Sequence, residues 1–136
     1  MRLDIYQKET EQVTHKQVSI LNIAREKMKK GEKLNPIEEN GVLHALQILI
    51  ENAIGKAKHI LKSIDIAVPI SGYESFEELI NQNRIAHKDS NEWNGIIGLR
   101  NKIVHDYMNI DFEMINEIIE KQRYQIVVDF LLEPIE

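Results

Sequence analysis

One feature constrains the fold more than any other: apolar residues recur at three- and four-residue steps from Leu43 to Ile64. This spacing places the apolar side chains on one face of an α-helix. Asn35 and Pro36 are typical of an N-cap and a first helical position, and two glutamates follow in the first turn, where carboxylates suit the helix dipole. The sequence therefore predicts one long helix from Pro36 to about Asp65.

Helical periodicity recurs on both sides of this helix, and no segment alternates apolar and polar residues as a half-buried strand would. Ser75 and Glu78 fit a capping box that would begin a short helix. Asn109 or Asp111 would cap the last helix. The further helices are expected over residues 4–30, around 75, over 93–110 and over 112–131. The chain is therefore predicted to be all-α, an up-and-down helical bundle of four to five helices.

The length and composition narrow the class of protein. A chain of 136 residues suits a single domain, 1–136, and is short for two. The absence of cysteine excludes thiolate zinc sites and a cysteine nucleophile. The polar N-terminus and the lack of an apolar run of about 18 residues predict a cytoplasmic protein that does not enter a membrane. The net charge of −5 argues against a broad phosphate-binding surface, although it leaves room for a small local site.

An arginine interrupts the apolar stripe of the helix expected at 93–110. At roughly 100° per residue, Arg100 falls between Val104 and Tyr107, where a charged side chain needs a partner or a purpose. Asn101 and His105 share a neighbouring face of the helix, and Arg100 and His105 diverge by roughly 140°. One helix cannot easily aim both at one target, so the pattern favours a homodimer in which two copies enclose a shared cleft.

These residue types suit the cleavage of RNA without a metal. A histidine can take a proton from the 2′-OH, or give one to the leaving oxygen, near neutral pH. An arginine matches the geometry of a phosphate group and can stabilise the charge that develops on it. Asn101 can orient the imidazole of His105 or bind a phosphate oxygen, and Tyr107 adds a phenol.

The stretch R-N-K-I-V-H-D-Y resembles the R-x-x-x-x-H-x-Y motif of HEPN-domain ribonucleases, specifically the HepT-like toxins that are paired with a nucleotidyltransferase antitoxin. The segments HALQILIENAI, VPISGYESFEEL, IIGLRNKIVHDY and IDFEMINEII stand in the order and spacing of that family. The resemblance implies an HEPN-like fold and a dimeric, metal-independent endoribonuclease toxin with no cofactor. It further implies that Arg100, His105 and Asn101 are the catalytic residues, and that an MNT-type nucleotidyltransferase antitoxin modifies Tyr107 with AMP.

Other interpretations of the same residues remain. Arg100 can simply pair with Glu51 on the long helix. The pair His105-Asp106 also occurs in metal phosphohydrolases, but no second helical cluster supplies the further ligands that such sites need. The chief alternative function is a non-catalytic helical subunit that binds a nucleotidyltransferase or presents nucleotides to it, with Arg100 and His105 as phosphate contacts.

Overall fold

The computed structural model describes residues 3–135, and the predicted domain 1–136 includes residues 1, 2 and 136, which lie outside the described residues. Over the described range the chain is helical and has no strand, so the all-α prediction is confirmed. There are six α-helices in this range, and not four or five, together with two short 3₁₀ helices. They are α1 (Leu3–Lys29), α2 (Pro36–Ser63), α3 (Gly72–Asn81), η1 (His87–Asp89), α4 (Ser90–His105), η2 (Tyr107–Asn109), α5 (Phe112–Glu120) and α6 (Gln125–Leu132).

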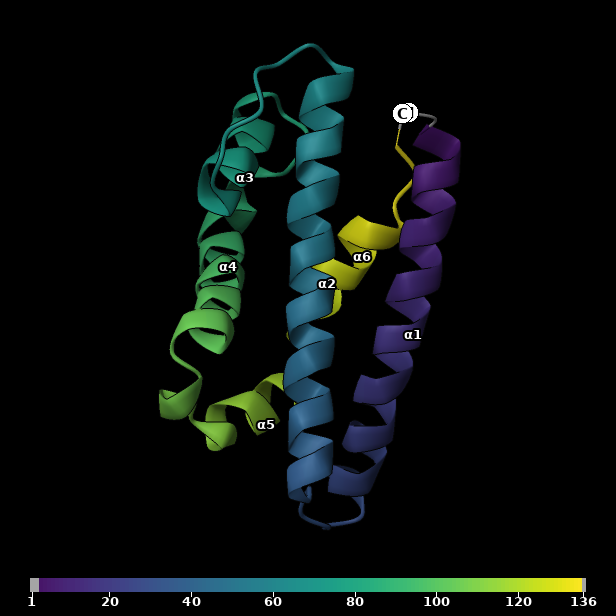
Figure 1. Ribbon diagram of the computed structural model, residues 1–136, viewed down its shortest axis with the longest axis vertical. Coiled ribbons are helices and arrows are strands. Elements are labelled where there is room, and N and C mark those ends of the chain that lie inside the picture. Colours follow the sequence, from purple (N-terminus) through teal and green to yellow (C-terminus); the bar gives the residue numbers. More distant parts are fainter. Residues whose placement is uncertain (1–2, 136) are drawn as a thin grey trace.

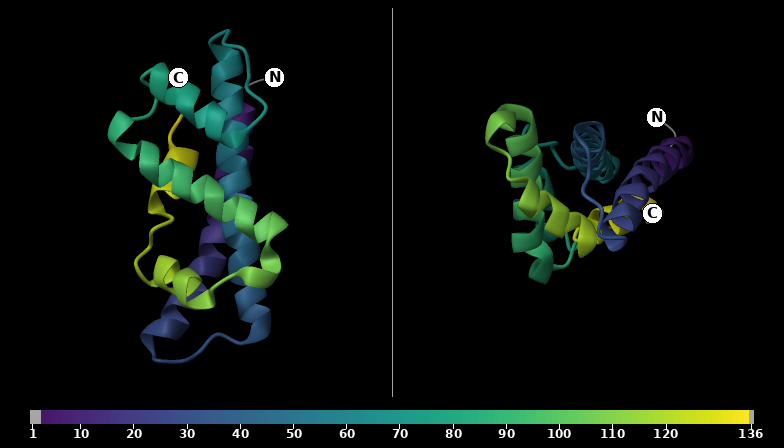
Figure 2. Two further views of the ribbon diagram at one scale, coloured as in Figure 1. Left: turned by 90° about the vertical axis from the view of Figure 1, so that its left-hand side faces the viewer. Right: turned by 90° about the horizontal axis from the view of Figure 1, so that it is seen from below.

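The helices α1 and α2 form a long antiparallel pair joined by a turn at Gly31, whose φ of +77° favours glycine (Figure 1). Seen along the long axis of the molecule, α2 lies between α1 and α4, and the chain of α5 and α6 spans the space from α4 to α1 (Figure 2). The helix α6 contacts both α1 and α2. The predicted up-and-down arrangement describes the α1–α2 pair, whereas α5 runs crosswise beside the lower part of α2 in Figure 1.

The predicted start of α2 agrees with the structure in detail. The Asn35 side chain accepts a hydrogen bond from the backbone N–H of Glu38, and the Glu38 carboxylate accepts one from the backbone N–H of Asn35. These two bonds form a complete capping box, with Pro36 at the first helical position. The strength of this start signal explains why the longest helix was predictable from the sequence.

The start of α3 differs from the prediction by one turn. Two serines in this region are followed three residues later by glutamate, and the first of them, Ser71, is the N-cap. The Ser71 hydroxyl accepts a hydrogen bond from the backbone N–H of Glu74 at 3.1 Å. Ser75, predicted as the cap, is fully buried inside the helix and donates to the Ser71 carbonyl oxygen at 2.8 Å. Since both serines fit the pattern, spacing alone could not choose between them.

The helix predicted over 112–131 is divided in two. The helix α5 ends at Glu120, and a turn that includes Gln122, with φ of +51°, leads into α6. The buried ring of Tyr124 anchors this turn in the core. This break accounts for the sixth α-helix of the described residues.

Aromatic packing joins α3, α4 and α6 at the centre of the molecule. Trp93 is buried and stacks on Phe76 with 4.2 Å between ring centroids, and Phe130 lies edge-on to Trp93 at 5.3 Å. The Trp93 ring is therefore a core residue and does not form an exposed stacking platform. Through this cluster, the position of α4 depends on α6 as well as on α3.

A lysine is buried in the middle of α2. Lys56 is 1% exposed, and its Nζ donates to the carbonyl oxygens of Phe130 at 2.7 Å and Leu131 at 3.2 Å, and also to that of Glu133. Carbonyl groups at the end of a helix have no partner within the helix, so the ammonium group satisfies the end of α6. Burial lowers the pKa of Lys56 to about 8. The Lys56 side chain thus links α6 to α2 through three hydrogen bonds.

Candidate active site

Arg100 lies on the face of α4 that meets α2, where Glu51 holds it. Arg100 Nε and Nη2 donate to Oε2 of Glu51 at 3.1 and 2.9 Å, and Nη1 donates to Oδ1 of Asn101 at 3.1 Å. The side chains of Arg100 and Glu51 are 28% and 32% exposed. Of the five N–H donors of a guanidinium group, two therefore remain without a partner among the described residues. The cation is fixed in direction, and part of it is open to solvent.

His105 is the last residue of α4 and is exposed. Asn101 lies one turn earlier on the neighbouring face and is half-buried. The Arg100 guanidinium is turned against α2, whereas the imidazole of His105 lies at the exposed helix end. Within one chain, a hydrogen bond therefore joins Arg100 to Asn101, whereas neither residue forms a hydrogen bond with His105.

The position of Tyr107 corrects the sequence prediction. The helix was expected to continue to Ile110, which would have placed Tyr107 on the stripe of Arg100, but α4 ends at His105. Asp106 has φ −138° and ψ 39°, and Asn109 donates to it twice: from its backbone N–H to the Asp106 carbonyl oxygen at 3.0 Å and from Nδ2 to Oδ1 at 2.6 Å. Such local side-chain bonds compete with helix continuation. Tyr107 therefore begins the 3₁₀ helix η2, and the prediction that it lies on the same helical stripe as Arg100 is wrong.

The Tyr107 phenol reaches across to the first turns of α2. Its Oη donates to Oδ1 of Asn40 at 2.7 Å, and the residue is half exposed. Asn40 and Glu51 are eleven residues apart, which is about three helical turns, so both lie on one stripe of α2 that faces the end of α4. Sequence reasoning considered Glu51 only as a structural partner of Arg100 and missed Asn40. The signal that could have found them is this polar stripe along an otherwise apolar helix.

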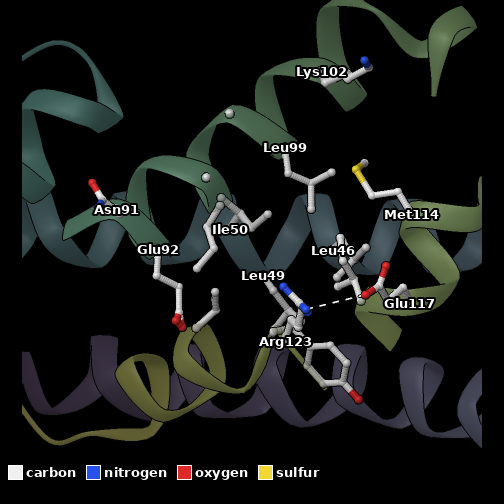
Figure 3. A pocket seen from close by; sticks show the side chains of 16 residues that line it. Leu46, Leu49, Ile50, Asn91, Glu92, Leu99, Lys102, Met114, Glu117 and Arg123 are labelled. Carbon is white, nitrogen blue, oxygen red and sulfur yellow. Dashed lines mark ion pairs between the residues drawn. The ribbon is translucent and has the colours of Figure 1, made fainter. Parts of the chain in front are cut away.

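A hollow beside α4 is not part of this site. A cavity of about 730 Å³ lies on the other side of α4, between α2, α4, α5 and α6 (Figure 3). Its floor is apolar, with Leu46 and Leu49 from α2, and the ion pair between Arg123 and Glu117, 3.6 Å apart, lies at its rim. None of Arg100, Asn101, His105 and Tyr107 lines it.

Two features of residues 3–135 bear on the kind of protein. No group of three or more histidine, aspartate or glutamate side chains there is arranged to hold a metal ion. No helix in that range has both the length and the apolar character needed to cross a membrane.

Comparison with known proteins identifies relatives in sequence. A family model described as Ribonuclease HepT-like matches residues 8–131. The mRNA nuclease HepT of Shewanella oneidensis is 29% identical over 82 residues, which are 60% of this chain and 62% of that protein. The chain thus aligns with less than two thirds of the length of this curated relative.

Two solved structures share the fold, each with a TM-score of 0.64 and each matching 88% of this chain. One is a crystal structure of a toxin–antitoxin complex with AMP-PNP, at 19% identity over 97% of that chain. The other is a re-refined structure of a tri-AMPylated Shewanella oneidensis HEPN toxin in complex with MNT antitoxin, at 21% identity over 96% of that chain. The family model extends from the first helix to the last and includes the whole of α4. The predicted resemblance to HepT-like proteins is thereby confirmed, and this chain belongs to the HepT-like ribonuclease family.

Proposed function

We propose that this protein is the toxin of a toxin–antitoxin pair, and that it cuts RNA without a metal in a site built by two copies of the chain. The observation that carries the proposal is the environment of Arg100, a guanidinium group held by Glu51 with two N–H donors left free, on the helix that ends at exposed His105. Membership of the HepT-like ribonuclease family supports the same activity.

In this proposal, His105 moves the proton and Arg100 stabilises the charge. Attack of a 2′-OH on the adjacent phosphorus forms a 2′,3′-cyclic phosphate and releases a 5′-OH, with His105 taking the proton of the nucleophile or supplying that of the leaving oxygen. The two free N–H groups of Arg100 bind the phosphoryl oxygens. Asn101, which accepts a hydrogen bond from Arg100, fixes the guanidinium from a second side.

A second copy of the chain is needed because Arg100 and His105 face in different directions in one protomer. Two α4 helices packed across a two-fold axis would place two arginines and two histidines around one cleft. The RNA substrate would then bind between the protomers, and the proposal makes the homodimer the active species.

We further propose that an MNT-type nucleotidyltransferase antitoxin silences the protein by transferring AMP to Tyr107. The phenol is half exposed and lies two residues beyond His105. Phosphodiester charge attached there would compete with RNA for the cations of the cleft. A structural relative of this chain is an AMPylated toxin in complex with its antitoxin, which supports this mode of control.

One observation favours a second candidate, a non-catalytic subunit that binds or serves a nucleotidyltransferase. The Glu51 carboxylate pairs with Arg100, as it would with an arginine that has a binding and not a catalytic role. In that case Arg100 and His105 would bind phosphate groups without cleaving RNA.

The two candidates differ in one assay. The purified protein is incubated with RNA at neutral pH and EDTA, beside the variants Arg100→Ala and His105→Ala and the control His15→Ala, which changes an exposed histidine of α1. The toxin proposal expects cleavage by the wild type and the control, with cyclic phosphate ends, and loss of cleavage in both site variants at unchanged circular dichroism. Absence of cleavage by the wild type would favour the second candidate, and inhibition by EDTA would contradict the metal-independent mechanism.

A further inference from the structure

The hydrogen bond between Tyr107 and Asn40 joins two parts of the chain that are otherwise loosely connected. The 3₁₀ helix η2 follows the end of α4, and residues 106–109 are all exposed. Among the described residues, the Tyr107 hydroxyl has Asn40 as its one hydrogen-bond partner, and Asn40 has no other side-chain bond. This single bond therefore sets the direction in which the phenol points.

Asn40 has no evident structural task besides this bond. It is exposed, lies inside a helix where asparagine is a poor helix former, and comes five residues after the N-cap Asn35. An alanine would fit the exposed helix surface at this position at least as well. The presence of an amide there needs another explanation, and its one contact, with the Tyr107 hydroxyl, offers it.

We propose that Asn40 is a positioning residue for the transfer of a nucleotide to Tyr107: its side-chain oxygen holds the phenol hydrogen, so that the lone pairs of Oη face solvent, where a nucleotidyltransferase approaches. This inference rests on the proposed modification of Tyr107 and adds the residue that prepares the acceptor. Ile37, three residues before Asn40, and Met108, directly after Tyr107, are 83% and 91% exposed, so both partners of the hydrogen bond lie near exposed apolar side chains of the kind that a protein partner can cover.

The transfer step balances with a nucleoside triphosphate as co-substrate. The phenolic oxygen of Tyr107 forms a bond to the α-phosphorus, the α–β phosphoanhydride bond breaks, and pyrophosphate leaves. The phenol proton passes to a base of the transferase, because a neutral amide oxygen such as that of Asn40 can accept a hydrogen bond but does not take up the proton. Asn40 therefore orients the nucleophile and performs no proton transfer.

The size of the effect follows from one hydrogen bond between neutral groups at a half-exposed site. Such a bond shifts the population of the held orientation by about two- to tenfold. Loss of orientation lowers the rate of the chemical step and leaves binding of the triphosphate to the transferase unchanged. Asn40→Ala should accordingly lower kcat for AMP transfer about two- to tenfold while KM for ATP stays the same.

The experiment measures the addition of AMP to the full chain by intact mass, with the cognate transferase and ATP, for four proteins. Asn40→Ala should have a lower kcat than the wild type. Asn40→Asp keeps an acceptor oxygen at the same place and should recover kcat, with any repulsion of the triphosphate appearing in KM. Asn22→Ala, which changes an exposed asparagine of α1, should match the wild type.

The outcomes separate this inference from the proposed function. If the wild type accepts AMP at Tyr107 and Asn40→Ala has the same kcat, the positioning role of Asn40 is overturned, while the proposed control by AMP stands. Wild type that is never modified, although its partner transferase is active, overturns the proposed control by AMP and this inference with it. RNA cleavage by unmodified Asn40→Ala, measured in the same preparation, should equal that of the wild type and shows that the variant is folded.

Discussion

Lys56 predicts an unusual dependence of stability on pH. Its pKa is about 8 in the folded protein because burial disfavours the ammonium form, against 10.5 for an ordinary lysine. Between these two values the unfolded chain binds more protons than the folded one, so the free energy of unfolding rises with pH. This increase in the free energy of unfolding is complete above pH 10.5 and is lost as the pH falls through 8. Integration from pH 7 to pH 10 gives a gain of about 2–3 kcal/mol from this residue alone.

The test compares the wild type with Lys56→Met, in which the volume is kept and the titrating group is absent. Urea denaturation followed by circular dichroism at pH 7, 8, 9 and 10 gives the free energy of unfolding of each protein, and their difference cancels every other titrating group. At pH 7 the two should have similar stability. The variant leaves the carbonyls of Phe130 and Glu133 without their donor, at a cost of about 1–3 kcal/mol each, but it also removes the penalty of a buried charge.

The decisive quantity is the slope with pH. Between pH 7 and pH 10, the free energy of unfolding of the wild type should rise by about 2–3 kcal/mol relative to that of Lys56→Met. A difference that stays constant over this range would mean that the three carbonyl oxygens fully compensate the burial of the ammonium group. The reasoning from desolvation would then be refuted, and the pKa of Lys56 would have to lie near its ordinary value.

Three further predictions concern the site, the assembly and the fold. Glu51→Gln should lower kcat for RNA cleavage about tenfold, because Arg100 loses the charge that orients it. The loss of this partly exposed ion pair should also lower the free energy of unfolding by about 1 kcal/mol. An unchanged rate of cleavage would show that Glu51 does not serve the site. Sedimentation equilibrium at micromolar concentration should give twice the mass of one chain, and a monomer would argue against a site shared between protomers. Ser71→Ala should cost about 1 kcal/mol in urea denaturation through loss of the α3 cap, whereas no loss would indicate that Ser71 does not stabilise the helix start.

The part of the fold that could be predicted from the sequence is the part with local signals. The helix α2 begins with a complete capping box and has a continuous apolar stripe, so its start and its length were both predictable. The end of α4 was not, because no glycine or proline marks it, and the helix ends instead through bonds between Asp106 and Asn109 that periodicity does not reveal. The break between α5 and α6 likewise interrupts an unbroken apolar pattern.

In the candidate site, too, the features that could be predicted are those that depend on residues close together in the sequence. The direction of Arg100 relative to His105 follows from residue spacing within one helix, and the structure has both residues in α4. Contacts between helices lie beyond such reasoning: Tyr107 meets Asn40 across 67 positions, and Lys56 meets Phe130 across 74. Nothing local distinguishes a lysine that caps a distant helix from one that lies in solvent.

The packing of α6 has a consequence for how the chain matures during translation. Gln7, near the start of α1, donates to the carbonyl oxygen of Leu131, 124 residues later, and Trp93 of α4 packs on Phe130. During synthesis, the part of α1 that faces α6 therefore stays uncovered until α6 has left the ribosome, and so does the part of α4 that packs on Phe130. A nascent chain that still lacks α6 has an incomplete core beside α4, so the helix that carries Arg100 reaches its final packing only after α6 has been synthesised.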